Sequence, residues 1–197
     1  MVSRPPSVGV VAIAIWLSCI GAGFAIWEQY ESTPTQSLGT PQPCPPSDFK
    51  SVVVMYAHPH CPCSRAGLTE LAGVARECGL DVLFRIVFVI PSGSPPDWER
   101  GKNWDLASEF PFAQVSRDVG GAEARRVGAT ASGLVVAFNQ QGDVVYRGGI
   151  TRARGREGAS RGRHSLVAIL TGTQRQAEER PVFGCPLFES EREPISR

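Results

Sequence analysis

The chain has 197 residues, 42% of them hydrophobic, which is enough for one ordinary domain with appendages but not comfortably for two domains. The formal net charge of +1 gives no general attraction to nucleic acid, and the sequence contains no nucleic-acid-binding motif. These features argue against a nucleic-acid partner and leave a compact domain that carries extra segments.

An uncharged apolar run, VGVVAIAIWLSCIGAGFAIW, occupies residues 8–27. A helix of this length rises about 30 Å, the thickness of the hydrocarbon core of a bilayer. Arg4 precedes the run and Glu28 follows it, so the positive-inside tendency predicts residues 1–7 in the cytoplasm and the rest outside. We therefore expect a single-pass anchor in the inner (cytoplasmic) membrane, with the globular part on the periplasmic side.

A cleaved signal peptide is the alternative, because Gly23-Phe24-Ala25 forms a small-x-small cleavage site. The length of the run and its tryptophans favour an uncleaved anchor. On either interpretation the bulk of the chain is exported.

Export bears on the 6 cysteines of the chain. Cys19 lies in the apolar run, and the others enter a compartment where disulfides persist. These others are Cys44, Cys61, Cys63, Cys78 and Cys185. Their number is odd, so at least one exported thiol is free or shared.

Residues 28–50 are rich in Pro, Ser, Thr and Gln, which is the composition of an extended tether. Residues 51–57, SVVVMYA, then predict a buried strand. Apolar residues recur at helical spacing from Leu68 to Cys78, and DVLFRIVFVI at 81–90 predicts a second strand. A strand, a helix and a strand in such close succession indicate a parallel pair with a crossover helix.

The second half of the chain continues with a loop from residue 91, and Asp97 could cap a short helix that runs toward Phe110. A brief strand, one or two helical turns, a hairpin and a final helix are expected next. These predicted elements are FAQVSRD, GGAEARRVGA, SGLVVAFNQQGDVVYRGGI and HSLVAILTG, with the hairpin turning at NQQG. Residues 176–197 form a C-terminal tail that contains Cys185 and that ends polar after PVFGCPLF.

This order of elements is that of the thioredoxin fold, an α/β fold with a central mixed sheet flanked by helices, here behind one transmembrane helix. The segment EARRVGATASGLVVAFNQQGDVVYRGGI resembles the second half of periplasmic, membrane-tethered thioredoxin-like proteins, and the resemblance covers residues 51 to about 172, so that we assign a domain at 51–175. HPHCPCSRA, with a later GGIT and a terminal FGCPLF, is also similar to bacterial RedB-like proteins.

The resemblance implies that the redox cysteines are Cys61 and Cys63, which follow the first core strand at the start of the first core helix. The chain departs from that family in two ways. It has Cys-x-Cys in place of Cys-x-x-Cys, and Gly133, after Ser132, stands where the family has a cis-proline. That proline helps to hold an extended substrate and keeps metal out, so its absence improves the prospects of metal binding.

Three chemistries compete for the Cys-Pro-Cys motif: thiol–disulfide exchange, metal binding and a structural disulfide. Pro62 suits the first helical position, which would make Cys61 the N-cap. Its sulfur would then lie beside unpaired N–H groups and the positive end of the helix dipole, open to solvent. We therefore expect the pKa of Cys61 to fall below the ordinary value of about 8.5. His58, His60 and Arg65 would add to this effect if their charges point toward the sulfur.

By the exchange hypothesis Cys61 attacks and Cys63 resolves the mixed disulfide, with protein thiols or disulfides as partners and no cofactor required. A disulfide across one spacer residue closes a small, strained ring, which favours disulfide donation or isomerisation over reduction.

The metal hypothesis uses Cys61 and Cys63 with His58 and His60, because thiolates and imidazoles suit copper(I) or zinc. The structural hypothesis is weaker, since closing so short a loop stabilises little. Cys185 has two open roles: a bridge to Cys44 that pins the tether to the tail, or a third thiol or metal ligand at the site.

Six arginines and five glycines are concentrated at residues 147–163, RGGITRARGREGASRGR. A solvated loop is one interpretation. In the thioredoxin arrangement this connection borders the cysteine site, where it would form a cationic rim.

Overall fold

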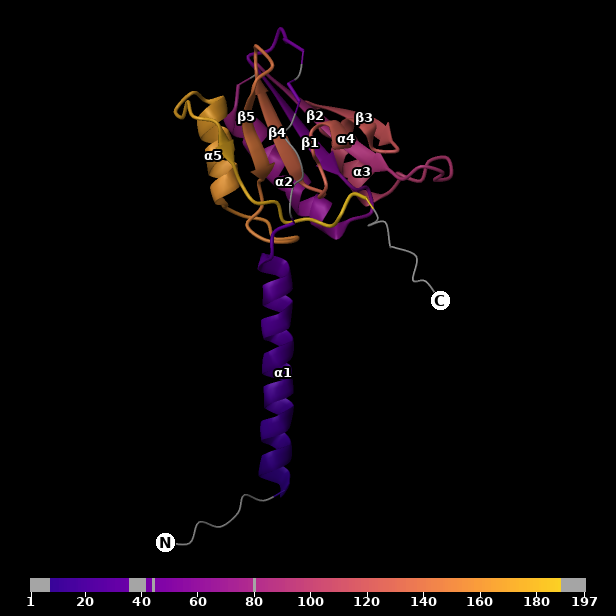
Figure 1. The fold of residues 1–197 in the computed structure, drawn as a ribbon, viewed down its shortest axis with the longest axis vertical. Helices are drawn as coiled ribbons and strands as arrows, with labels where there is room; N and C mark the ends of the chain where they lie inside the picture. The colour runs from indigo at the N-terminus through magenta and orange to yellow at the C-terminus, as the bar shows by residue number, and fades with distance from the viewer. Residues whose placement is uncertain (1–7, 36–41, 44, 80, 189–197) are drawn as a thin grey trace. The chain divides into compact units, whose positions relative to one another are not determined.

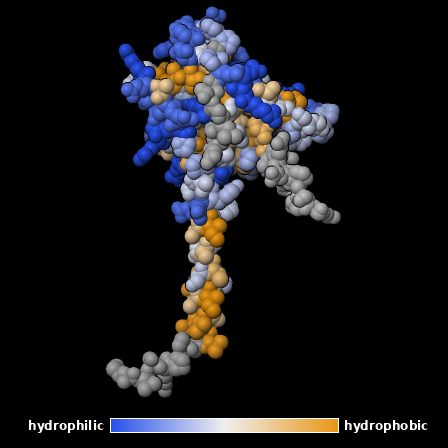
Figure 2. Space-filling view, in the orientation of Figure 1, coloured by the Kyte–Doolittle hydropathy of each residue, from blue (hydrophilic) through white to orange (hydrophobic). Residues whose placement is uncertain are grey.

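The computed structural model describes residues 8–35, 42–43, 45–79 and 81–188, and it divides into two compact units, Met1–Thr33 and Pro34–Arg197. In the first unit, helix α1 (Val8–Ser32) is apolar from Val8 to Trp27, ends on mostly polar residues and has no buried residues (Figure 2). Its most apolar window has a mean hydropathy of 2.2, which would allow it to span a bilayer. A signal sequence near the N-terminus would have the same properties.

The second unit is built around a six-stranded sheet in the order β3-β2-β1-β4-β5-β6 (Figure 1). The strands are β1 (Ser51–Ala57), β2 (Val82–Ile90), β3 (Ala113–Val119), β4 (Leu134–Asn139), β5 (Val144–Gly149) and β6 (Glu178–Glu179). β1, β2 and β3 are parallel, whereas β4 runs antiparallel to both β1 and β5. The helices are α2 (Pro62–Glu77), α3 (Lys102–Ser108), α4 (Ala122–Arg126) and α5 (Arg161–Leu170).

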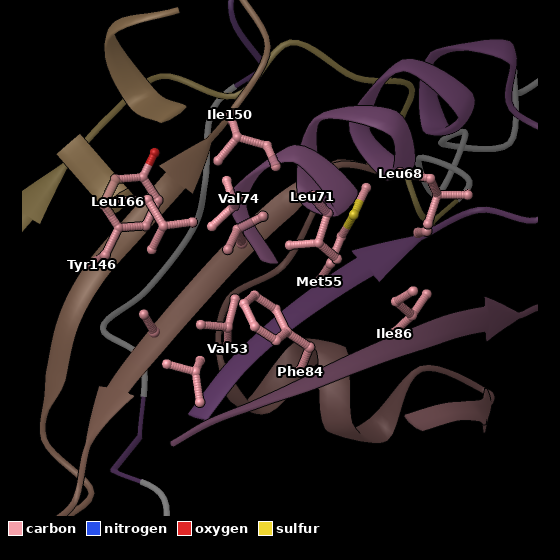
Figure 3. Packing of buried hydrophobic residues seen from close by; sticks show 14 of the residues in the cluster. Val53, Met55, Leu68, Leu71, Val74, Phe84, Ile86, Tyr146, Ile150 and Leu166 are labelled. Carbon is pink, nitrogen blue, oxygen red and sulfur yellow. The ribbon is translucent and has the colours of Figure 1, made fainter. Parts of the chain in front are cut away.

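Both faces of the sheet are covered, which explains why β1 is apolar at successive positions. Val53 and Met55 face a cluster that includes Leu68, Leu71 and Val74 of α2 (Figure 3). Residues of α3 and α5 join the same cluster.

The opposite face of β1 packs against a second cluster. Val52 and Val54 contribute to it from β1, and Ala124 contributes from α4. Val182 and Leu187 also belong to it, although they lie in the C-terminal tail. The tail is therefore part of the packed domain on this face.

The strand–helix–strand unit, the hairpin and the final helix confirm the thioredoxin-like fold expected from the sequence. One local expectation differs from the structure. Asp97 does not cap α3, because the helix begins at Lys102 after Gly101. The tail contributes to the domain, since β6 pairs with β5, and Val182 and Leu187 are 1% and 4% exposed. The polar end expected after PVFGCPLF lies outside the described residues.

Leu71 of α2 has no exposed surface, so its replacement tests how far the core depends on this helix. We expect Leu71→Ala to lower the free energy of unfolding by about 2–5 kcal/mol, because it removes buried methyl groups and leaves a cavity. Thr69→Ala, at an exposed position of the same helix, is the control. Chemical denaturation should show equal stability for Leu71→Ala and the control if α2 is not anchored in this way.

Candidate active site

Cys61 is the N-cap of α2 and has extended backbone angles, φ −81° and ψ 123°. Pro62 follows at the first helical position, where its missing N–H costs no hydrogen bond. The Cys61 side chain accepts no capping hydrogen bond from the helix. The local sequence thus places this thiol directly at the junction between the loop after β1 and the start of α2.

Two hydroxyl groups hold the loop that leads to Cys61. The Ser132 Oγ accepts a hydrogen bond from the backbone N–H of His58 at 2.9 Å. The Ser64 hydroxyl donates a hydrogen bond to the His58 carbonyl at 2.8 Å. The two serine oxygens are 2.7 Å apart, and both residues are buried. The hydroxyl pair therefore joins the start of α2 to the segment that precedes β4.

Asn103 of α3 supports the same loop from the other side. Its buried side-chain amide donates to the carbonyls of Pro59 and Cys61, both at 2.9 Å. Sequence reasoning missed this residue because an asparagine in a short helix carries no local sign of such a role. Its contacts fix the backbone on both sides of His60.

The C-terminal tail brings a third thiol to this place. Ser132 N–H donates to the Cys185 carbonyl and Leu187 N–H donates to the Thr130 carbonyl, each at 2.8 Å. Ala131 and Pro186 thereby form an antiparallel bridge. In Figure 1 the yellow tail runs past the end of the sheet where α2 begins. This pairing sets Cys185 next to Cys61.

The sulfur atoms of Cys61, Cys63 and Cys185 all lie within 4.8 Å of one another. The sulfurs of Cys61 and Cys185 are only 2.6 Å apart, and all three residues are free cysteines. Cys61 is 4% exposed, so the expectation of a solvent-open sulfur is wrong. It belongs to neither apolar cluster of the core, and the tail residue Cys185 lies against it.

The pKa of the Cys61 thiol lies well below its ordinary value, as expected, but mainly for a different reason. Hydrogen bonding with the Cys185 thiol and then with the Cys63 thiol is the largest cause, and it outweighs the opposing effect of burial. The pKa of Cys63 is raised, first by its interaction with Cys185 and then by Cys61. The pKa of Cys185 is raised chiefly by its interaction with Cys61. Of the three thiols, Cys61 is the one whose pKa is lowered.

The neighbouring cationic candidates do not surround this thiolate. Burial lowers the pKa of His58, which favours the neutral ring near pH 7. The His60 ring packs on Trp98 with centroids 4.6 Å apart, and its Nε2 lies 2.6 Å from the Trp98 carbonyl oxygen. Arg65 is exposed on α2. Within the described residues, the thiol cluster includes neither histidine.

Gly133 has φ +92°, which glycine adopts freely and which proline, fixed near −65°, does not. Its N–H also donates to the Tyr56 carbonyl at 2.8 Å, a bond that proline lacks the hydrogen to make. The described residues contain no cis peptide bond. The backbone at this position therefore excludes the proline that the resembling family carries.

The connection between β5 and α5 does border the thiols. A Cβ atom on Gly155 would lie 4.0 Å from the Cys63 sulfur, and the Arg154 guanidinium donates to the Gly184 carbonyl. The buried Glu70 holds the loop by accepting the Gly158 N–H at 2.6 Å. Because Arg154 binds backbone of the tail, the loop serves there as a support as well as a source of charge.

The remaining cysteines are elsewhere. Cys44 lies outside the described residues, so its bridge to Cys185 stays a prediction. Cys78 is partly buried against the core, and burial raises its pKa to about 11, which makes it a poor nucleophile at neutral pH. Cys19 lies in α1.

No protein-family model and no curated protein match the chain. A hypothetical protein from Sinorhizobium meliloti is 15% identical with a TM-score of 0.63, covering 81% of this chain and 100% of its own. An uncharacterized conserved protein from Geobacillus kaustophilus is 20% identical with a TM-score of 0.57, covering 82% and 96%. These likenesses show the fold alone.

A secreted Mycobacterium tuberculosis disulfide oxidoreductase is 16% identical and has a TM-score of 0.42, with 62% of this chain and 81% of its own covered. That similarity is too low to support an inference about function.

Replacing Cys185 with alanine removes the largest cause of the lowered Cys61 pKa. We expect the pH midpoint of Cys61 alkylation by iodoacetamide, followed by peptide mass spectrometry, to rise by about one pH unit or more. The fraction of thiolate at neutral pH would then fall. Cys185→Ser keeps a hydroxyl donor and should move the midpoint less. An unchanged midpoint in Cys185→Ala would contradict the assigned cause.

Proposed function

We propose that the chain is a membrane-anchored thiol–disulfide exchange protein whose nucleophile is Cys61. The observation that supports this most directly is the cluster of three thiols at the start of α2, whose sulfurs lie within 4.8 Å of one another, with the pKa of Cys61 lowered. Exchange requires a thiolate that attacks and a second thiol that releases the product. The thioredoxin-like fold is compatible with this chemistry but does not by itself assign it.

The reaction begins when the Cys61 thiolate attacks one sulfur of a partner disulfide. The Cys61–partner bond forms as the partner's own disulfide breaks, and the second partner sulfur leaves as a thiolate. A neighbouring thiol then loses its proton and attacks Cys61, which releases the first partner sulfur. Cys63, as expected from the sequence, and Cys185 both lie near enough for this second step.

The proposed partners are thiols or disulfides of exported proteins. Arg4 before the apolar helix and Glu28 after its apolar run favour an anchor with the domain on the periplasmic side of the inner membrane. That compartment sustains disulfide chemistry. The placement thus agrees with the chemistry proposed for the thiols.

Oxidised glutathione provides a direct test on the reduced full-length protein in detergent. We expect Cys61→Ser to slow formation of the glutathione mixed disulfide by about two orders of magnitude or more, because serine cannot form that bond. Intact-mass spectrometry measures the adduct. Cys78→Ser, which removes a thiol with a raised pKa, is the control. Equal rates for Cys61→Ser and the wild type would refute the proposed nucleophile.

Metal binding is the second candidate, and the close approach of the three sulfurs favours it. Soft thiolates select copper(I) or zinc, so Cys61, Cys63 and Cys185 would hold the ion. The histidines predicted as ligands do not join this cluster in the described part of the chain. On this hypothesis, the bound ion would protect Cys61 from alkylation.

Copper(I) added to the reduced protein without oxygen separates the two candidates. If the thiols form a metal site, we expect one equivalent to bind, Cys185→Ser to weaken binding at least severalfold, and His60→Ala to leave it unchanged. Elemental analysis and competition with a chelator provide the readouts. Failure to retain copper or zinc would eliminate the metal candidate and leave exchange.

A further inference from the structure

The tail that carries Cys185 is held as a strand rather than as a loose end. Residues 185–187 pair with residues 130–132 through two backbone hydrogen bonds of 2.8 Å. Val182 and Leu187, on either side of Cys185, are 1% and 4% exposed. Because a shift in register would expose these two apolar side chains, their burial fixes the register of residues 185–187 against residues 130–132. The register in turn determines which tail residue faces Cys61.

Gly184 makes this close pairing possible. A Cβ atom there would overlap the Ser132 carbonyl oxygen, so only glycine lets the two backbones approach this closely. The Gly184 carbonyl accepts hydrogen bonds from the Thr35 hydroxyl and the Arg154 guanidinium. The residue immediately before Cys185 is thereby fixed by backbone contact and by two side chains.

Cys185 has a geometric advantage over Cys63 as a partner for Cys61. A Cys61–Cys63 bond would close a ring with a single spacer residue, which imposes strain. Cys185 lies 124 residues away in sequence, so ring size imposes no strain on its bond to Cys61. The two sulfurs already lie 2.6 Å apart, not far from the bonding distance of about 2.05 Å.

We propose that Cys185 is the thiol that resolves the Cys61 mixed disulfide, and that pairing of the tail with residues 130–132 delivers it. The inference rests on the proposed exchange function. The Cys185 thiol gives up its proton as its sulfur attacks the Cys61 sulfur, the Cys61–Cys185 disulfide forms, and the partner sulfur leaves as a thiolate that takes up that proton. Two protein thiols are oxidised while one partner disulfide is reduced, so electrons balance over the single turnover.

The same tail covers Cys61 before the reaction. Cys61 is almost completely buried, with Cys185 lying against it. On this proposal a partner disulfide reaches Cys61 once residues 185–187 have separated from residues 130–132. The tail therefore acts twice: its departure opens the site, and its return supplies the resolving thiol. In a variant with a loosened tail, the Cys61 mixed disulfide should form faster and be resolved more slowly. If the tail were merely structural, loosening it would not change these two rates in opposite directions.

The test follows the glutathione adduct of Cys61 in the full-length reduced protein after a pulse of oxidised glutathione. We expect Cys185→Ser to form the adduct and to lose it about two orders of magnitude more slowly than the wild type, because a tethered thiol acts at a high effective concentration. Cys63→Ser should resolve at nearly the wild-type rate. Peptide mapping should find Cys61 linked to Cys185 in the wild type.

Gly184→Ala provides the second variant, since it disturbs the tail without removing a thiol. We expect it to form the adduct severalfold faster and to resolve it more slowly. Gly79→Ala is the matched control, because a Cβ atom at Gly79 meets no neighbour within 4 Å. Circular dichroism checks that both variants are folded.

The outcomes separate the inference from the function on which it rests. If adducts form on Cys61 but persist in Cys63→Ser and not in Cys185→Ser, Cys63 resolves and the inference is overturned while exchange stands. If Cys61 forms no adduct even in Gly184→Ala, the exchange function itself fails. Linkage of Cys185 to Cys44 in the mapped wild type would also overturn the role proposed for the tail.

Discussion

The antiparallel pairing of residues 185–187 with residues 130–132 determines the composition of the site. Through this pairing the Cys61 thiol is buried beside Cys185, with which it is hydrogen-bonded. Glycine at position 184 is the steric condition for that pairing, and Val182 and Leu187 supply the apolar burial that sustains it.

The electrostatics of the site depend on thiols rather than on cations. A buried thiolate is costly unless its charge is solvated by donors. Here hydrogen bonding with the Cys185 and Cys63 thiols lowers the pKa of Cys61, while burial holds His58 toward its neutral form. The pKa values of Cys63 and Cys185 are raised by the same interactions. A lowered pKa on one sulfur and raised values on its neighbours suit the sequential exchange proposed for the site.

Local patterns in the sequence were sufficient for most of the fold. The apolar runs of β1 and β2, the helical spacing in α2 and the hairpin turn each depend on neighbours in sequence, and each was predicted. Cys61 and Cys63 were picked out by the Cys-Pro-Cys motif and by the resemblance to thioredoxin-like proteins, and their role in exchange stays a proposal. Cys185 and Asn103 act on Cys61 from 124 and 42 residues away, and such contacts leave no periodic signal. For Cys185 the sequence offered two roles and no means of choosing.

The arrangement around Arg154 affects how the domain can be studied. Its guanidinium binds both the Thr35 hydroxyl, at 3.0 Å, and the Gly184 carbonyl, so the beginning and the end of the domain are fastened to each other. Thr35 lies just beyond Ser32, the last residue of the apolar helix. A shortened protein that starts after Thr35, prepared to avoid detergent, would lose the hydrogen bond between Arg154 and Thr35. Its thiols would be more accessible than those of the intact chain, and its reactivity would overstate that of the natural protein.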